Sequence, residues 1–196
     1  MKKLTKKQRE SMAIDESNSV ARLLLEHSSS GEGPQSGIEA LEAYWQKSRR
    51  SPVARWIRFI VLRGEVELLL EMGRLLEAEV ATKRMTRLPA TPYARITAAW
   101  TRTELLRHLD RPGEAFLCAM CGLRICDRTN DVSGARNLIR EIIRLRTHHY
   151  IEELASKYGN LVTEACRLSP FVDLLGTDAR PPLQALEVLT EQVRDG

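Results

Sequence analysis

Three of the four cysteines lie close together, in the stretch Cys118-Ala119-Met120-Cys121-Gly122 and at Cys126. Two cysteines separated by two residues can supply two thiolates to a tetrahedral zinc ion. A structural zinc site needs two further ligands, for which the sequence offers Cys126, Cys166, His148 and His149. Because no second closely spaced pair accompanies the first, Cys118 and Cys121 are only a weak metal candidate, and we expect no cofactor.

The alternative interpretation of the cysteines is structural. They share their segment with apolar residues at helical spacing, namely Ala115, Leu117, Ala119 and Leu123. A free cysteine packs as a small apolar side chain, and a helix with neighbours on two sides needs many small residues. This pattern is not a secreted disulfide framework, so we expect the cysteines to be reduced and the protein to be intracellular.

Other residues that could do chemistry do not form a catalytic pattern. The sequence has no glycine-rich phosphate loop, no G-x-S-x-G elbow and no H-E-x-x-H helix. His148 and His149 are adjacent, so on a helix they point about 100° apart and cannot bind one metal ion from one face. Glu152 and Glu153 are interpreted as a solvated helix face. We therefore expect a protein that is not an enzyme.

A second pattern is a stripe of three arginines, Arg136, Arg140 and Arg144, which recur every four residues. Only Glu141 offers an opposite charge at helical spacing. Like charges at this spacing destabilise an isolated helix by about 0.2–0.5 kcal/mol per pair, so the stripe requires an anionic neighbour. That neighbour is either an acidic surface of this protein or an external anion, including nucleic acid.

The elements that carry these residues are predicted to be helices throughout, because apolar residues recur at helical spacing and no segment alternates with period two. The sequence thus predicts an all-α fold. Ser51-Pro52 and Thr91-Pro92 are each expected to provide an N-cap and a first helical residue. The expected helices span residues 4–27, 36–49, 52–72, 74–88, 92–109, 112–127, 132–157, 160–168 and 183–193.

Composition and charge exclude several classes of protein. The chain has 196 residues, of which 43% are hydrophobic and 29% charged, so it can form a core and is neither disordered nor a disulfide mini-protein. No apolar run approaches the ~18–20 residues needed to cross a bilayer, and no apolar segment follows the basic start as in a secretory signal. We expect no membrane association and a cytoplasmic location.

Short patterns also recur at intervals of 37–40 residues. The motif P-x-A-R begins at Pro52 and again at Pro92. An alanine follows four residues after an arginine in the segments 74–78 and 111–115. Over about residues 20–128 this spacing resembles the tetratricopeptide repeat (TPR), a helical repeat of about 34 residues. The longer period, and Asp110 where glycine is usual, depart from that family. A non-repeating helical bundle is the alternative.

The resemblance implies antiparallel helix pairs stacked as a short right-handed superhelix with N- and C-terminal capping helices. It implies one TPR-like domain over residues 1–176, with the repeats at about 20–128 and C-terminal helices at 132–175. A linker and a terminal amphipathic helix would then occupy residues 177–196.

The same resemblance implies a non-catalytic adaptor, scaffold or small subunit of a larger complex. Its partner would be another protein, bound as a peptide or helix in the groove. The mixture of charged and aromatic groove residues favours an extended segment with acidic and apolar side chains. The implied groove residues are Ile60, Arg63, Glu67, Leu70, Thr97, Trp100, Glu104 and Arg107.

The alternative function is that of a basic helical nucleic-acid-binding protein or ribonucleoprotein subunit. The arginine stripe at Arg136, Arg140 and Arg144 supports it, as does the lysine-rich start at residues 2–9, although that start is more typical of a solvated terminus. Residues 161–196 hold three basic and six acidic residues, which argues against it. Salt separates the two hypotheses, because phosphate binding weakens steeply with ionic strength.

Overall fold

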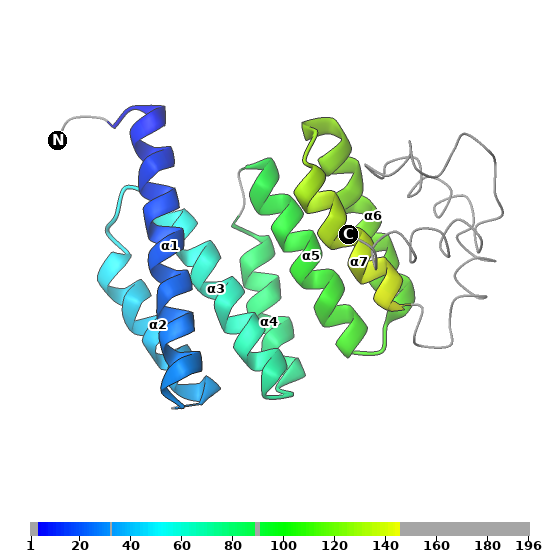
Figure 1. Cartoon of the computed structure of the whole chain (residues 1–196), viewed down its shortest axis with the longest axis horizontal. Helices are drawn as coiled ribbons and strands as arrows, with labels where there is room; N and C mark the ends of the chain where they lie inside the picture. The colour runs from blue at the N-terminus through cyan, green and yellow to red at the C-terminus, as the bar shows by residue number, and fades with distance from the viewer. Residues whose placement is uncertain (1–3, 32, 89–90, 146–196) are drawn as a thin grey trace. The chain divides into compact units, whose positions relative to one another are not determined.

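The computed structural model describes residues 4–31, 33–88 and 91–145, and within them the chain forms seven helices and no strand (Figure 1). The expected all-α class is therefore confirmed for this part of the chain. By its internal contacts the chain divides into two compact units, residues 1–90 and 91–196. The helices expected beyond residue 145, together with Cys166, His148 and His149 and the proposed boundary at residue 176, lie outside the described residues.

The first unit contains four described helices: α1 (Lys6–Ser30), α2 (Pro34–Ser48), α3 (Ala54–Glu71) and α4 (Leu75–Thr86). α1 begins with a capping box, in which the Thr5 hydroxyl accepts from the Gln8 amide and the Gln8 side chain accepts from the Thr5 amide. Each helix packs against the next one along the chain, and α1 also contacts α3.

The core of this unit forms where α1, α2 and α3 meet. Its buried members are Val20, Leu41, Val53, Ile57 and Val61. Trp56, at the start of α3, packs on this cluster and donates its indole N–H to the Ala13 carbonyl and the Ser17 hydroxyl of α1, each at 2.9 Å. A half-buried indole N–H therefore has partners, and these bonds hold the first turn of α3 against α1.

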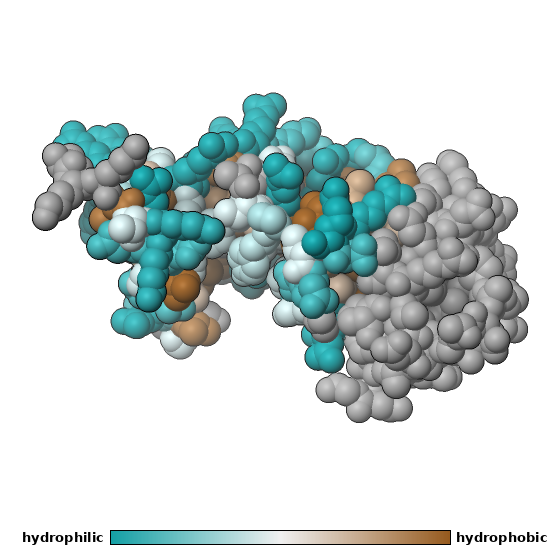
Figure 2. Space-filling model, turned by 90° about the horizontal axis from the view of Figure 1, so that it is seen from above, coloured by the Kyte–Doolittle hydropathy of each residue, from teal (hydrophilic) through white to brown (hydrophobic). Residues whose placement is uncertain are grey.

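The second unit contains α5 (Pro92–His108), α6 (Pro112–Thr129) and α7 (Val132–Leu145), with α6 and α7 each packed on α5. Its core includes Phe116, Met120, Leu123, Leu138 and Ile139, all nearly inaccessible to solvent. Around these cores the surface is mostly polar. The face shown in Figure 2 is largely hydrophilic, with apolar residues as separate small areas.

The three helices of the second unit approach most closely at Gly122 on α6. A Cβ atom at this position would lie 2.7 Å from Leu138 Cδ1 on α7 and 3.0 Å from Ala99 Cβ on α5. Real Cβ atoms do not tolerate the shorter of these distances unless the neighbouring side chain moves. Glycine, the only residue without a Cβ, therefore lets the three helices pack here without a shift of the Leu138 side chain.

One of the two expected cap-and-proline starts is confirmed and the other is wrong. Thr91 caps α5, its hydroxyl accepting from the Ala94 amide at 3.2 Å, and Pro92 is the first helical residue. By contrast, α3 begins at Ala54 with Val53 as its N-cap. Two turns precede the helix: the Ser51 amide donates to the Ser48 carbonyl at 2.8 Å, and the Ala54 amide donates to the Ser51 carbonyl at 3.0 Å. Pro52 thus lies in the turn before the helix.

Three helix-to-helix connections share one backbone geometry. Each contains a residue with positive φ: Gly73 (68°), Asp110 (55°) and Asn130 (53°). The amide of the following residue then donates to the carbonyl five residues earlier, from Arg74 to Leu69, from Arg111 to Leu106 and from Asp131 to Cys126, at 2.9–3.0 Å. This is the six-to-one bond of a Schellman turn. A buried alanine follows each turn: Ala78, Ala115 and Ala135.

Candidate functional site

The first unit has a pocket of about 390 Å³ where the end of α1, the α1–α2 turn and the second half of α3 meet. Two turn residues in it, Gly31 and Gly33, have φ values of 73° and 81°, a backbone conformation that favours glycine. The pocket thus follows from a turn that only small residues form easily. Its remaining lining residues are Leu24, Leu25, His27, Pro34, Glu67, Leu68 and Glu71.

The walls of the pocket are apolar, and its charges are carboxylates. Leu25 is 69% exposed. Glu67 is already bound by Arg63 on the same helix, at 2.9 Å. Glu71 is exposed and has no ion-pair partner among the residues that the structure describes. A ligand entering the pocket would therefore meet leucine side chains and one uncompensated negative charge.

At the edge of the pocket, the Ser36 hydroxyl lies 3.3 Å from His27 Nδ1. A serine beside a histidine is one part of nucleophilic catalysis, which also needs a group that orients the base and donors that stabilise an oxyanion. The contact joins the end of α1 to the start of α2. It places a polar bridge beside the pocket and does not by itself define a reaction.

The groove residues expected on α3 differ in their surroundings. Ile60 is partly buried against the core, and Leu70 is half-buried. Arg63 forms the ion pair with Glu67 described above. Of these four residues only Glu67 lines the pocket.

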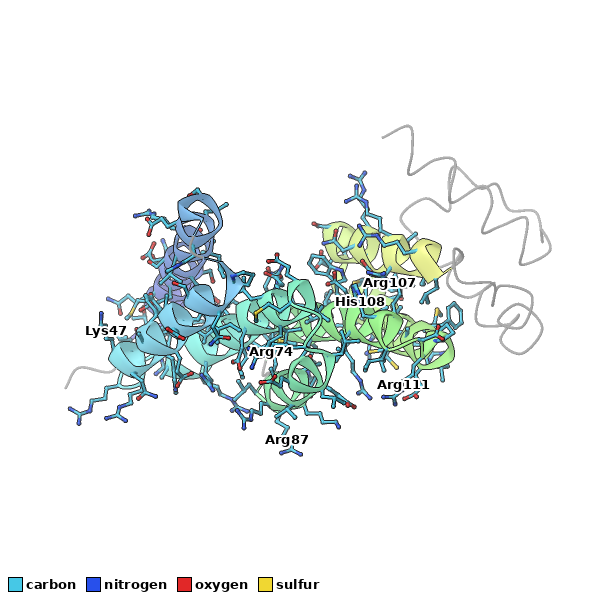
Figure 3. The ribbon with its side chains drawn as sticks, turned by 90° about the horizontal axis from the view of Figure 1, so that it is seen from below. Lys47, Arg74, Arg87, Arg107, His108 and Arg111 are labelled. Atoms are coloured by element: carbon cyan, nitrogen blue, oxygen red, sulfur yellow. The ribbon has the colours of Figure 1, made fainter. Side chains whose placement is uncertain are left out.

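The groove residues expected on α5 are less accessible. Thr97 is only 5% exposed, and Trp100 packs against the core of the second unit. Glu104 is half-buried. Arg107 donates from Nε to the Glu141 carboxylate on α7 at 3.3 Å, and Figure 3 shows Arg107 and its neighbour His108 by α7.

The arginine stripe of α7 has an internal anionic partner. Glu141 is 1% exposed, and it accepts from Arg144 Nη1 at 2.6 Å as well as from Arg107. Arg136 and Arg140 are exposed on the same helix, and Arg140 has no ion-pair partner within the described ranges. The stripe is thus neutralised at Arg144 by the one acid that the sequence analysis found within helical reach of it.

The three clustered cysteines have unlike environments. Cys118 is half-buried and its thiol donates to the Ala99 carbonyl at 3.5 Å, whereas Cys121 is exposed. Cys126 is buried, and that burial, with Asp131 nearby, raises the pKa of its thiol to about 12. Burial also raises the pKa of Cys118. Among the described residues, no group of three or more histidines, cysteines or carboxylates is arranged to hold a metal ion.

Sequence reasoning missed two features. The pocket depends on the backbone of a turn, which the sequence marks only by the glycines on either side of Glu32. The other is a group of four exposed cations at the α2–α3 connection, which we call the basic end: Lys47, Arg49, Arg50 and Arg55. The sequence does contain a signal for the basic end, because no aspartate or glutamate occurs between Glu42 and Glu65.

Comparison with protein-family models, curated proteins and solved structures finds no match to this chain. Within the described part of the chain, none of the helices is both long enough and apolar enough to cross a membrane.

Proposed function

We propose that the protein is a non-catalytic interaction module of the cytoplasm, an adaptor, scaffold or small subunit that binds a segment of another protein. The observation that carries this proposal is the pocket beside α3, with apolar walls and an exposed leucine. Concave, mostly apolar sites with a few polar groups are typical of ligand and peptide recognition. Exposed leucines in such sites supply much of the binding free energy when they become buried.

The charge of the pocket indicates the chemistry of its partner. The implied groove residues, with their mixture of arginine, tryptophan and glutamate, favour an extended segment with acidic and apolar side chains; the groove arginines are Arg63 and Arg107. Both arginines are bound by carboxylates of this chain, Glu67 and Glu141. Glu71 is the charge that remains, so we expect the bound segment to combine an apolar side chain with a lysine or arginine.

The proposal includes a TPR-like arrangement, in which the hairpins stack as a short right-handed superhelix. The shared turn geometry of the α3–α4, α5–α6 and α6–α7 connections supports it, since each turn is followed by a buried alanine. A small residue at this position lets the two helices of a hairpin approach closely. The third such turn, at Asn130, lies beyond the segment from which the resemblance was drawn.

Selection of a displayed peptide library on the immobilised full chain tests the proposal. Selected peptides are then titrated against the natural chain and against Leu25→Glu. Since burying a leucine contributes about 1.5–3 kcal/mol, we expect Leu25→Glu to weaken binding at least about tenfold. The peptides should be enriched in apolar residues next to lysine or arginine.

The matched control is Leu76→Glu on α4, which changes a leucine that is 76% exposed and does not line the pocket. This variant should bind the selected peptides as tightly as the natural chain does. The proposal fails if no peptide is enriched, or if the two leucine variants lose affinity equally.

A further inference from the structure

The basic end is an exposed segment of the first unit that carries cations and no acid. Its cations lie within the nine positions 47–55, at the end of α2, in the connecting turn and in the first turn of α3: Lys47, Arg49, Arg50 and Arg55. All four are exposed, and none forms an ion pair with a described residue. The Lys47 side chain points away from the α2 ribbon in Figure 3.

Three acids of α1 and α2 have partners outside the basic end. Glu42, one turn before the basic end, binds Arg58 at 2.8 Å. Burial raises the pKa of Glu42, but the hydrogen bonds from Arg58 and Gln46, together with the charges of Arg58 and Arg84, hold it below its usual value. Glu16 on α1 is bound by the Tyr44 hydroxyl. Glu10, near the start of α1, lies 3.8 Å from Lys6. The positive charge of the basic end is therefore not compensated from α1 or α2.

The basic end lacks the apolar anchor that a protein partner would use. The large exposed apolar side chains of the described residues are Ile14, Leu25, Leu76, Val80, Tyr93 and Leu117, and none belongs to this segment. Energetic hot spots of protein interfaces lie in well-packed, desolvated centres and are enriched in tryptophan, tyrosine and arginine. The basic end supplies arginine, but no exposed aromatic or aliphatic side chain that could pack around it. A surface with charge and no anchor suits a partner recognised by charge alone.

The two nearby tryptophans are occupied. Trp45 lies under the Arg58 guanidinium, 5.3 Å from its ring centroid, and Trp56 stacks on Phe59 and binds α1. They are therefore not open platforms on which bases could stack, as single-strand binders of the stacking type use. Contacts at the basic end would be made to phosphates, which arginine binds through its planar fork.

We propose that the basic end binds the phosphate backbone of nucleic acid, a single strand included, without preference for base sequence. This site is separate from the pocket and does not depend on the proposed function. With four phosphate contacts, the logarithm of the association constant should fall with the logarithm of salt concentration with a slope of about −2.8. That slope corresponds to a loss of about 50-fold in affinity between 50 and 200 mM salt.

The experiment titrates the full chain into a fluorescein-labelled 20-nucleotide single-stranded RNA of mixed sequence, and follows anisotropy at several salt concentrations. One variant replaces Lys47, Arg49, Arg50 and Arg55 with alanine. The matched control replaces four other exposed arginines without ion pairs among the described residues, Arg22, Arg87, Arg95 and Arg102, so that the net charge is identical. Circular dichroism establishes that both variants keep their helices.

We expect the first variant to lose more than tenfold in affinity at 50 mM salt and to bind with a much shallower salt slope. The control should stay within about threefold of the natural chain, and Arg49→Lys with Arg50→Lys should retain binding because the charge is kept. The proposal is overturned if the RNA does not bind at 50 mM salt, or if both alanine variants weaken binding equally. It is also overturned if a 20-residue polyglutamate peptide, or vesicles of phosphatidylcholine and phosphatidylserine, bind the basic end at least as tightly.

Discussion

Arg107 on α5 donates to the carboxylate of Glu141 on α7 at 3.3 Å, across 34 residues of sequence. Glu141 is 1% exposed and is also bound by Arg144 at 2.6 Å. A carboxylate removed from water requires partners of this kind, because an unpaired buried charge is strongly unfavourable. The relationship fixes α7 on α5 and gives the arginine stripe an internal role at one of its three positions.

Replacing Glu141 should therefore destabilise the second unit. Glu141→Ala leaves the Arg107 guanidinium, 18% exposed, without its acid, and we expect a loss of about 2–3 kcal/mol in the free energy of unfolding. Arg144 is 56% exposed and can be solvated, so Arg144→Ala should cost less than about 1 kcal/mol. Urea denaturation followed by circular dichroism measures both. Equal losses for the two variants would contradict this account.

The shared turns make a second prediction. Asp110 adopts the left-handed conformation that Gly73 adopts in the preceding hairpin, and a side chain there is strained. Asp110→Gly should raise the free energy of unfolding by up to about 1 kcal/mol, and Gly73→Ala should lower it by about the same amount. Asn130→Gly should change it less, since asparagine tolerates this conformation best. Thermal denaturation of the three variants measures the order of their stabilities. A destabilising effect of Asp110→Gly would contradict the prediction.

The cysteines should differ in reactivity. Cys121 is exposed and should be alkylated rapidly in the folded chain, whereas Cys126 is buried with a thiol pKa of about 12 and should react only after unfolding. Cys118, whose pKa is raised by burial, should react at an intermediate rate. Iodoacetamide labelling followed by peptide mass spectrometry gives the three rates at pH 7.5. Zinc protecting Cys118 and Cys121 together would instead favour the metal interpretation.

Glu65 on α3 should give the first unit a pH dependence. Burial, opposed by Arg58, raises the pKa of Glu65 above its ordinary value of 4.5, so the folded state binds this proton more tightly than the unfolded state. Its contribution to stability is then greatest below pH 4.5 and is lost as pH rises through the folded pKa. Glu65→Gln should be more stable than the natural chain at pH 7, and the difference should narrow toward pH 4.

The comparison variant for that measurement is Glu77→Gln. In the natural chain, hydrogen bonds from Arg74 lower the pKa of Glu77. This carboxylate therefore stabilises the fold at pH values above its ordinary pKa, and the stabilisation is lost as the solution is acidified. Between pH 4 and pH 7, the difference in urea midpoint from the natural chain should change in opposite directions for Glu65→Gln and Glu77→Gln. Parallel trends would refute the assignment of Glu65.

Much of the helix pattern was predictable because it depends on local sequence. Thr91-Pro92 begins α5 as expected, with the Thr91 hydroxyl as its cap. The helix start expected at Ser51-Pro52 is wrong, although this dipeptide also places a hydroxyl residue before a proline. The difference is that residues 51–53 continue the turn from the end of α2, which the dipeptide does not encode.

The candidate sites were less predictable because they depend on distant contacts. The sequence identified Glu141 as the acid nearest Arg144, but Arg107 reaches it from another helix. Asp110 counted as a departure from the repeat pattern, yet it has the same backbone conformation as Gly73. An aspartate at position 110 does not by itself indicate a left-handed backbone conformation, so the sequence did not predict that Asp110 would adopt the conformation of Gly73.

The bonds that Trp56 makes to α1 also provide an optical probe. Its indole N–H is held by the Ala13 carbonyl and the Ser17 hydroxyl, and its ring stacks on Phe59, with centroids 5.4 Å apart. Detachment of α1 would expose this ring to water and shift its emission to longer wavelength. In a chain with three tryptophans, replacing Trp45 and Trp100 by phenylalanine would leave a fluorophore that reports the docking of α1.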